Sequence, residues 1–271
     1  MGNCANKKNT NQDTDKPIES VDDLLKIKQS HQPQEQPTTA DTQDIPIFRY
    51  YPLQPSPNTA SNDQEIISSQ VIDEHANTVK LLLNNGEYLG NCTNNIPNGK
   101  GKFFHNNGDV YEGSFKDGKL YGKGIYKHKN GVIYTGSFFD NLKNGYGIEE
   151  YPNGEVYKGN FSNGLKNGKG IYNFKDNAIY EGLISNDQKH GLGLLTEPSG
   201  DKYFGDWEKD IRQGKGRFTY SNGKEYEGEF LNNVMHGKGT VKSENYKYVG
   251  KFFNGNEQGQ GEVLHSDGIK S

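Results

Sequence analysis

The sequence predicts an all-β protein, namely an elongated single-layer antiparallel β-hairpin solenoid of eight 23-residue repeats that follows a disordered N-terminal segment. Tyrosine recurs every 23 residues from Tyr88 to Tyr226, and once more 22 residues later at Tyr248. A glycine follows each of these tyrosines by two positions, and every unit then contains a G-x-G pair. Residues 1–76 lack this pattern, so we divide the chain into an N-terminal segment, 1–76, and a repeat domain, 77–271.

The first strand of each unit carries a tyrosine, a glycine and an aromatic residue at alternate positions, as in Tyr111, Gly113 and Phe115. Side chains two residues apart lie on one face of a strand, so these residues should pack along the same face of the sheet. Cys92 and Ile184 replace the aromatic residue in two units. The other residues that we expect to pack there are Tyr134 and Phe138, Tyr157 and Phe161, Tyr203 and Trp207, and Tyr226 and Phe230.

A turn should end this strand at the eighth position of the unit. Glycine, asparagine and aspartate tolerate a positive φ angle better than other residues, so a position restricted to them indicates a left-handed backbone. The residues at the eighth position are Asn95, Gly118, Asn141, Gly164, Asp187, Asp210, Asn233 and Gly255.

A second strand should follow the G-x-G pair, as at Gly122 and Gly124, because apolar and polar residues alternate after it. It closes on Asn-Gly turns such as Asn130-Gly131. Glycine inside a strand is unfavourable by about 0.5 to 1 kcal/mol and persists where a side chain would be in the way. We therefore expect the tyrosine and phenylalanine rings of the same or the next hairpin to cover these glycines.

Half a repeat should cap the start of the sheet, because TVKLLL at 78–83 and the Asn84-Asn85-Gly86 turn resemble the second half of a unit. With neighbouring strands about 4.8 Å apart and two strands per unit, eight units would form a ribbon about 75 Å long.

The combination of Y-x-G-x-[FW] and G-x-G at this spacing resembles the MORN repeat (membrane occupation and recognition nexus) over residues 88–271. The resemblance implies a β-ribbon scaffold that binds other proteins, often near membranes or the cytoskeleton. In that family, catalysis belongs to attached domains such as phosphoinositide kinases and methyltransferases. Residues 1–76 show no succession of strands and helices that would form such a domain, so we expect no enzyme and no cofactor.

The charge of the repeats is nearly balanced. The chain has a formal net charge of −4, and the acidic excess lies before the first repeat. The lack of a strongly basic domain argues against a nucleic-acid partner. The histidines are scattered singly along the sequence, so we expect no metal site.

The N-terminal segment is rich in Asn, Gln, Pro, Ser, Thr and Asp, which is typical of disorder. Its start, MGNCANKK, offers Gly2 for N-myristoylation and Cys4 for palmitoylation, although Asn6 departs from the usual serine or threonine. One myristoyl chain binds a membrane only weakly, whereas two acyl chains bind stably, and Lys7 and Lys8 would favour an anionic leaflet. We expect the protein to lie at the cytoplasmic face of a membrane, because the sequence contains no secretory signal and no segment that would span a bilayer. An unmodified terminus is the alternative.

Basic residues recur at two positions of the unit. Stacked hairpins would align them as one ridge that binds anionic phospholipid or an acidic protein, while a row of solvated lysines that discourages edge pairing is the alternative. The residues are Lys100, Lys123, Lys169, Lys215 and Lys238 inside the G-x-G pair, and Lys143, Lys166, Lys189 and Arg212 at the tenth position.

Two functions therefore remain open. In the first, which we favour, the protein is a membrane-tethered scaffold that holds partner proteins or anionic lipid on its ribbon. In the second, it is a soluble structural part of a cytoskeletal or ciliary assembly. Regulation of a phosphoinositide kinase follows from the family resemblance alone. The sequence leaves the oligomeric state open, a homodimer included.

Overall fold

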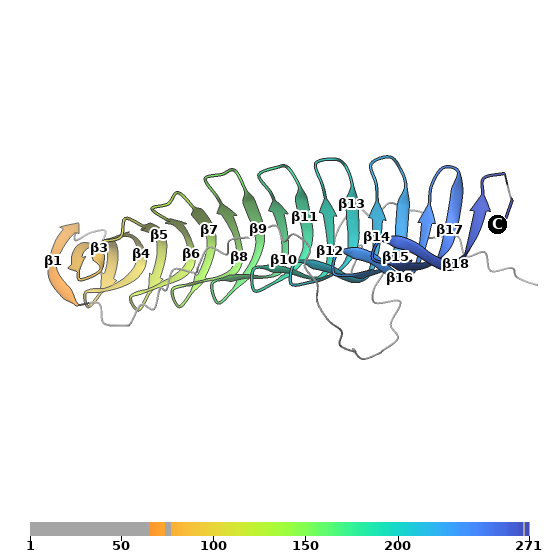
Figure 1. The fold of residues 1–271 in the computed structure, drawn as a ribbon. Helices are drawn as coiled ribbons and strands as arrows, with labels where there is room; N and C mark the ends of the chain where they lie inside the picture. Colours follow the sequence, from red (N-terminus) through yellow and green to blue (C-terminus); the bar gives the residue numbers. More distant parts are fainter. Residues whose placement is uncertain (1–64, 74–76, 268, 271) are drawn as a thin grey trace, which may run out of the picture. The chain divides into compact units, whose positions relative to one another are not determined.

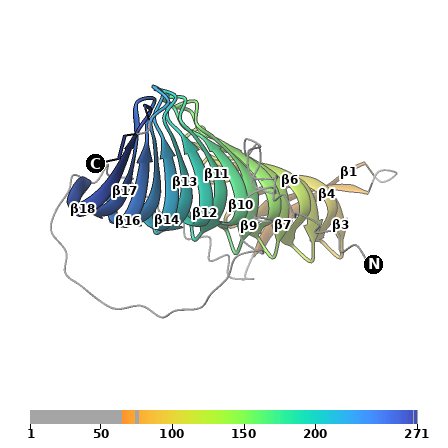
Figure 2. The same ribbon diagram turned by 90° about the vertical axis from the view of Figure 1, so that its right-hand side faces the viewer.

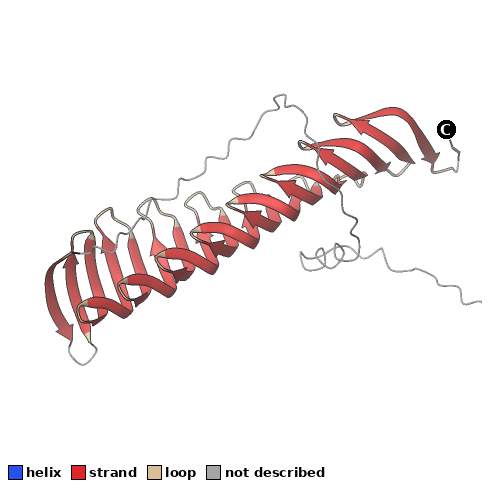
Figure 3. Cartoon of the chain, turned by 90° about the horizontal axis from the view of Figure 1, so that it is seen from below, coloured by secondary structure: helices blue, strands red, loops and turns tan. Residues whose placement is uncertain are grey.

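The computed structural model of the protein describes residues 65–73, 77–267 and 269–270. Gly2, Cys4 and the rest of the N-terminal segment up to residue 64 lie outside these residues. Every element of the described part is a β-strand, as Figure 3 shows. No helix in this part is long and apolar enough to cross a bilayer.

The eighteen strands of the described part form one antiparallel sheet, in which each strand pairs with its neighbours in the sequence. Figure 1 shows them in chain order along the sheet, with β1 at one end and β18 at the other. The strands are β1 (Ile66–Asp73), β2 (Thr78–Leu83), β3 (Gly86–Thr93), β4 (Ile96–His105), β5 (Val110–Lys116), β6 (Lys119–Lys127), β7 (Ile133–Phe139), β8 (Leu142–Glu150), β9 (Val156–Ser162), β10 (Leu165–Asn173), β11 (Ile179–Ser185), β12 (Gln188–Thr196), β13 (Lys202–Glu208), β14 (Ile211–Thr219), β15 (Glu225–Leu231), β16 (Val234–Lys242), β17 (Tyr246–Phe253) and β18 (Asn256–His265).

Each repeat is one hairpin with a tight turn between its two strands. All eight residues at the eighth position have a left-handed backbone, with φ between 59° at Asn95 and 86° at Gly164. The residue before each of them is also left-handed, even Lys209 with a φ of 50°. Positive φ at both central residues is typical of a type I′ turn, whose twist matches that of the flanking strands. The seventh position is Asn or Asp in every unit except the one with Lys209, so the residue types indicate a left-handed backbone there as well.

A bulge bends the second strand of each hairpin at the first glycine of the G-x-G pair. In β6, Gly124 pairs with Gly113 and Leu120 pairs with Phe115, so residues 121–123 face Ser114 alone. Bulges of this kind bend a strand and increase its twist. The hairpins are accordingly curved in Figure 2.

The sheet begins before the expected boundary at residue 77. β2 forms the expected half repeat, but β1 (IISSQVID) precedes it and pairs with it. This stretch has no strict alternation of apolar and polar residues, so the period-2 pattern could not reveal a strand there. All eight residues of β1 are exposed.

Candidate binding surfaces

One face of the sheet carries the repeated tyrosines and contains the core; we call it the tyrosine face. The seven tyrosines from Tyr88 to Tyr226 are at most 1% exposed. Four of these rings, those of Tyr111, Tyr134, Tyr203 and Tyr226, lie edge-on between the aromatic residues of their own and the next hairpin. The ring centroid of Tyr134 lies 5.1 Å from that of Phe138, with the planes at 86°, and 5.0 Å from that of Phe161, at 83°. Edge-to-face pairs add to the stabilisation from burial, and they fill this face.

Each tyrosine ring also covers two glycines of its own hairpin. A Cβ atom at Gly136 or Gly147 would lie less than 3.0 Å from atoms of the Tyr134 ring. The Tyr134 hydroxyl donates a hydrogen bond to the carbonyl oxygen of Ser137 at 2.9 Å. Burial raises the pKa of the equivalent Tyr226 to about 12, so these hydroxyls stay protonated as donors.

Gly122 plays a different part from the one expected of it. Gly113 and Gly124 lie under the ring of Tyr111, but the nearest atom to a Cβ at Gly122 would be Cβ of Ser114, at 3.6 Å. The φ of Gly122 is 68°, so this position requires glycine for the backbone conformation of the bulge.

The other predicted packing residues all lie on the tyrosine face. Trp207 makes edge-to-face contacts with Tyr180 and Tyr203, at centroid distances of 5.6 and 5.1 Å, and its Nε1 donates to the carbonyl oxygen of Gly193 at 3.2 Å. None of the following is more than 5% exposed: Tyr111, Phe115, Tyr134, Phe138, Tyr157, Phe161, Tyr203, Trp207, Tyr226 and Phe230.

Four of the nine predicted ridge residues lie on the tyrosine face and interact with its rings. The ammonium of Lys166, which is buried, lies 5.3 Å from the ring centre of Tyr157. The ammonium of Lys189 lies 5.2 Å from the ring of Trp207. Such cation–π contacts stabilise the core and leave this row with little exposure to a partner. The row consists of Lys143, Lys166, Lys189 and Arg212, which are paired with Phe138, Phe161, Ile184 and Trp207.

A buried carboxylate lies beside this row, and the sequence did not single it out. Glu149 stands where the preceding unit has Tyr126, and it is 5% exposed. It accepts hydrogen bonds from the hydroxyl of Tyr151 at 2.5 Å and from the ammonium of Lys143, and its carboxylate lies 3.0 Å from the ammonium of Lys166. Burial alone would raise the pKa of Glu149, but the two ammonium groups outweigh it and lower the pKa to about 2. The sequence signal that could have revealed Glu149 is an acidic residue at a position that is aromatic in the preceding unit.

The other five ridge residues lie on the opposite face, which we call the lysine face: Lys100, Lys123, Lys169, Lys215 and Lys238. All five are exposed. The prediction of a single ridge is therefore wrong, because the nine basic residues form two rows on opposite faces. The two positions are three residues apart in the unit, and alternation along a strand places an odd spacing on opposite faces.

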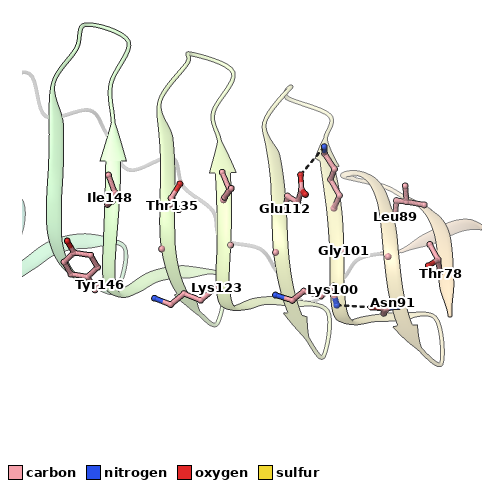
Figure 4. A pocket seen from close by; sticks show the side chains of 16 residues that line it. Thr78, Leu89, Asn91, Lys100, Gly101, Glu112, Lys123, Thr135, Tyr146 and Ile148 are labelled. Carbon is pink, nitrogen blue, oxygen red and sulfur yellow. Dashed lines mark hydrogen bonds and ion pairs between the residues drawn. The ribbon is translucent and has the colours of Figure 1, made fainter. Parts of the chain in front are cut away.

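An open depression with a volume of about 710 Å³ crosses the lysine face from β2 to β8 (Figure 4). Lys100 and Lys123 lie along one side, and Leu89 and Ile148 lie further up the strands. Glycines contribute bare backbone between them. The depression thus offers cations, apolar side chains and exposed backbone to a bound segment.

Neither metal binding nor thiol chemistry is indicated in the described part of the chain. No group of three or more His, Cys, Asp or Glu side chains within residues 65–73, 77–267 and 269–270 could hold a metal ion. Cys92 is buried at the aromatic position of the first unit, and burial raises the pKa of its thiol to about 11. It therefore acts as a small core residue.

A row of hairpins in one open sheet, with one face filled by its own rings and the other exposed, defines a repeat scaffold. The family model of the MORN repeat matches eight consecutive units, and the chain belongs to the MORN repeat family. Repeats of this family are generally non-catalytic scaffolds that bind proteins or lipids. The matched residues are 88–110, 111–133, 134–156, 157–179, 180–202, 203–225, 226–246 and 248–270.

The chain is distantly similar to several solved structures. The TCP domain of SAS-4 (dCPAP) of Drosophila melanogaster, solved in complex with a proline-rich motif of Ana2 (dSTIL), is 14% identical and has a TM-score of 0.38; the match covers 69% of this chain and 99% of that chain. The TCP10 domain of CPAP of Danio rerio is 13% identical, with 71% and 81% covered and a TM-score of 0.25. These similarities carry no argument about function. No curated protein sequence matches the chain.

Proposed function

We propose that the protein is a non-catalytic scaffold that binds partner proteins on the lysine face of its MORN sheet and is anchored to the cytoplasmic face of a membrane by acyl chains on Gly2 and Cys4. The difference between the two faces of the sheet carries the proposal. The tyrosine face is occupied by its own rings and cations, so among the described residues the lysine face is the broad surface that is open to a partner.

The chemistry of the lysine face favours a protein partner over a lipid surface. Exposed lysines lie beside apolar side chains such as Ile125, which is 37% exposed. Acidic residues occur there too, and Glu112 pairs with Lys102 at 3.3 Å. Anionic leaflets attract clustered positive charge, whereas protein interfaces combine apolar contacts with both signs of charge.

The acyl anchor is tested by comparing the wild type with Gly2→Ala, which cannot be myristoylated, and with Cys4→Ser. In membrane fractionation we expect Gly2→Ala in the soluble fraction. Cys4→Ser should give an intermediate result, because a single acyl chain binds weakly and exchanges between membranes. If the wild type and Gly2→Ala fractionate alike, the anchor proposal fails.

The lysine face is tested by a charge reversal, Lys123→Glu with Lys215→Glu and Lys238→Glu. A matched control reverses three exposed lysines in turns, Lys129, Lys175 and Lys209. Quantitative affinity capture should show proteins that the face variant loses and the turn variant keeps. Equal capture by both variants would contradict the proposal. Face-specific loss of binding to phosphatidylserine vesicles, without loss of captured proteins, would indicate a lipid partner instead.

A further inference from the structure

The depression on the lysine face contains apolar side chains that no part of the described sheet covers (Figure 4). Leu89 and Ile125 are each 37% exposed, and Tyr146 is 55% exposed. Tyr146 stands at a position that holds lysine in five other units, so the repeat itself does not require its ring. Exposed apolar side chains gathered on one surface mark a site of interaction. The depression is therefore suited to an apolar occupant.

The chain itself supplies an apolar segment close to this depression. Residues 45–53 read IPIFRYYPL and lie outside the described residues, within a stretch of sequence that is otherwise polar. The described chain begins at Glu65, whose carbonyl oxygen accepts a hydrogen bond from the backbone nitrogen of Asn84 at 3.2 Å. Asn84 lies in the turn between β2 and β3, and these strands contribute Thr78 and Leu89 to the depression. The segment thus joins the sheet at the end where the depression begins.

We propose that residues 45–53 dock along this depression of the same chain and cover its apolar side chains. The depression crosses six strand spacings from β2 to β8, or about 29 Å. Nine extended residues span about 30 Å, and Ile45 and Tyr51 favour an extended backbone because each precedes a proline. Residues 54–65 connect the segment to β1 and reach up to about 40 Å, which is enough for any position along the depression.

The composition of the segment matches the lining of the depression. Its branched and aromatic side chains would remove apolar side chains of the lining from water, and prolines dock on exposed aromatic rings such as that of Tyr146. Asp44, directly before the segment, carries a charge opposite to that of Lys100 and Lys123 in the lining. Two sites linked within one chain have an effective concentration in about the millimolar range. Contacts too weak for two separate molecules are therefore sufficient.

Docking of this segment would divide the lysine face into two parts with different accessibility. A partner that binds between β2 and β8 must displace residues 45–53, whereas a partner that binds from β9 onwards need not. The segment thus acts as a built-in competitor at one end of the face. Docking takes place in the purified chain alone, so it depends neither on a partner protein nor on the acyl anchor.

Lysine modification measures the coverage of the depression within one molecule. Lys123 lines the depression, Lys215 occupies the same repeat position beyond it, and both are exposed on the sheet. In the full-length protein, brief acetylation read by mass spectrometry should modify Lys123 several-fold more slowly than in the variant Phe48→Asp with Tyr50→Asp. The rate at Lys215 should be the same in both proteins. An equal rate at Lys123 in the wild type and the variant would overturn the proposal.

Photo-crosslinking in the full-length protein tests where the segment lies. The photoreactive residue p-benzoylphenylalanine in place of Tyr50 should form a cross-link within one chain, to a peptide from β3–β8. Ile125→Lys with Ile148→Lys should abolish this cross-link, and lysine already occupies the same position in the first unit. The matched control, Ile171→Lys with Leu194→Lys, changes this position in the next two units and should keep the cross-link. Cross-links to β9–β18, cross-linked dimers, or loss of the cross-link in both double variants would refute docking in the depression.

Discussion

The ring of Tyr134 occupies the space that a side chain at Gly147 would need, since a Cβ atom there would lie 2.5 Å from Cε2 of the ring. Gly147 belongs to β8 and pairs with Gly136 on β7, the strand that carries Tyr134. The ring therefore packs on the bare backbone of two strands, and the same arrangement occurs along the sheet.

Replacing Gly147 by alanine should destabilise the protein by about 2 kcal/mol, because the added methyl group overpacks the space under the ring. Chemical denaturation followed by circular dichroism measures this cost. The same substitution in a Tyr134→Leu background should cost less, because the smaller side chain leaves room and the two sites are coupled. Equal costs in both backgrounds would mean that the ring does not require glycine at this position.

Trp207→Ala should cost about 3–5 kcal/mol, because the indole is buried between Tyr180 and Tyr203 and loses all of these contacts. Trp207→Phe, which introduces the residue found at this position in five other units, should cost less than about 1.5 kcal/mol. Circular dichroism, rather than tryptophan fluorescence, follows the unfolding of both variants, because both substitutions remove the only tryptophan of the chain. An unchanged melting temperature for Trp207→Ala would show that the indole does not support the fold.

Glu149 should give the protein a specific acid sensitivity. Its pKa is lowered from 4.5 to about 2 in the folded state, so its ionised form contributes stability above about pH 4.5 that is lost as the pH falls towards 2. That shift corresponds to about 3 kcal/mol. Glu149→Gln should lose this amount at pH 7 and differ little from wild type at pH 2. The exposed neighbour variant Glu150→Gln should follow the wild-type curve, and parallel curves for wild type and Glu149→Gln would disprove the role of the carboxylate.

Asn141 links two consecutive hairpins. Its Oδ1 accepts a hydrogen bond from the backbone nitrogen of Leu120 at 2.8 Å, and its own φ is 69°. Asn141→Ala should cost about 2 kcal/mol, because it loses the hydrogen bond and keeps a side chain in a left-handed conformation. Asn141→Gly should cost about 1 kcal/mol less, because glycine adopts this conformation without strain. Thermal denaturation compares the two, and the reverse order would contradict this account.

Sequence spacing predicted the hairpins and the tyrosine–glycine pairing because both depend on strictly periodic residues. The odd spacing between the two basic positions of the unit also indicates two rows on opposite faces, but residue type obscured this, because lysine and arginine are usually exposed wherever they stand. Lys166 illustrates this: it is buried among rings, whereas Lys169, three residues further along the same strand, is exposed. Glu149 and β1 escaped detection for a related reason, because each departs from the periodic pattern that served as the guide.

The pairing of every strand with only its sequence neighbours also makes the sheet a ruler. Each repeat advances the sheet by two strands, or about 9.6 Å, and preserves the side chains that each face presents. Gain or loss of one 23-residue unit would thus change the distance between two proteins held at different repeats by one fixed step. The number of repeats between two docking positions would therefore set the distance between the two bound proteins.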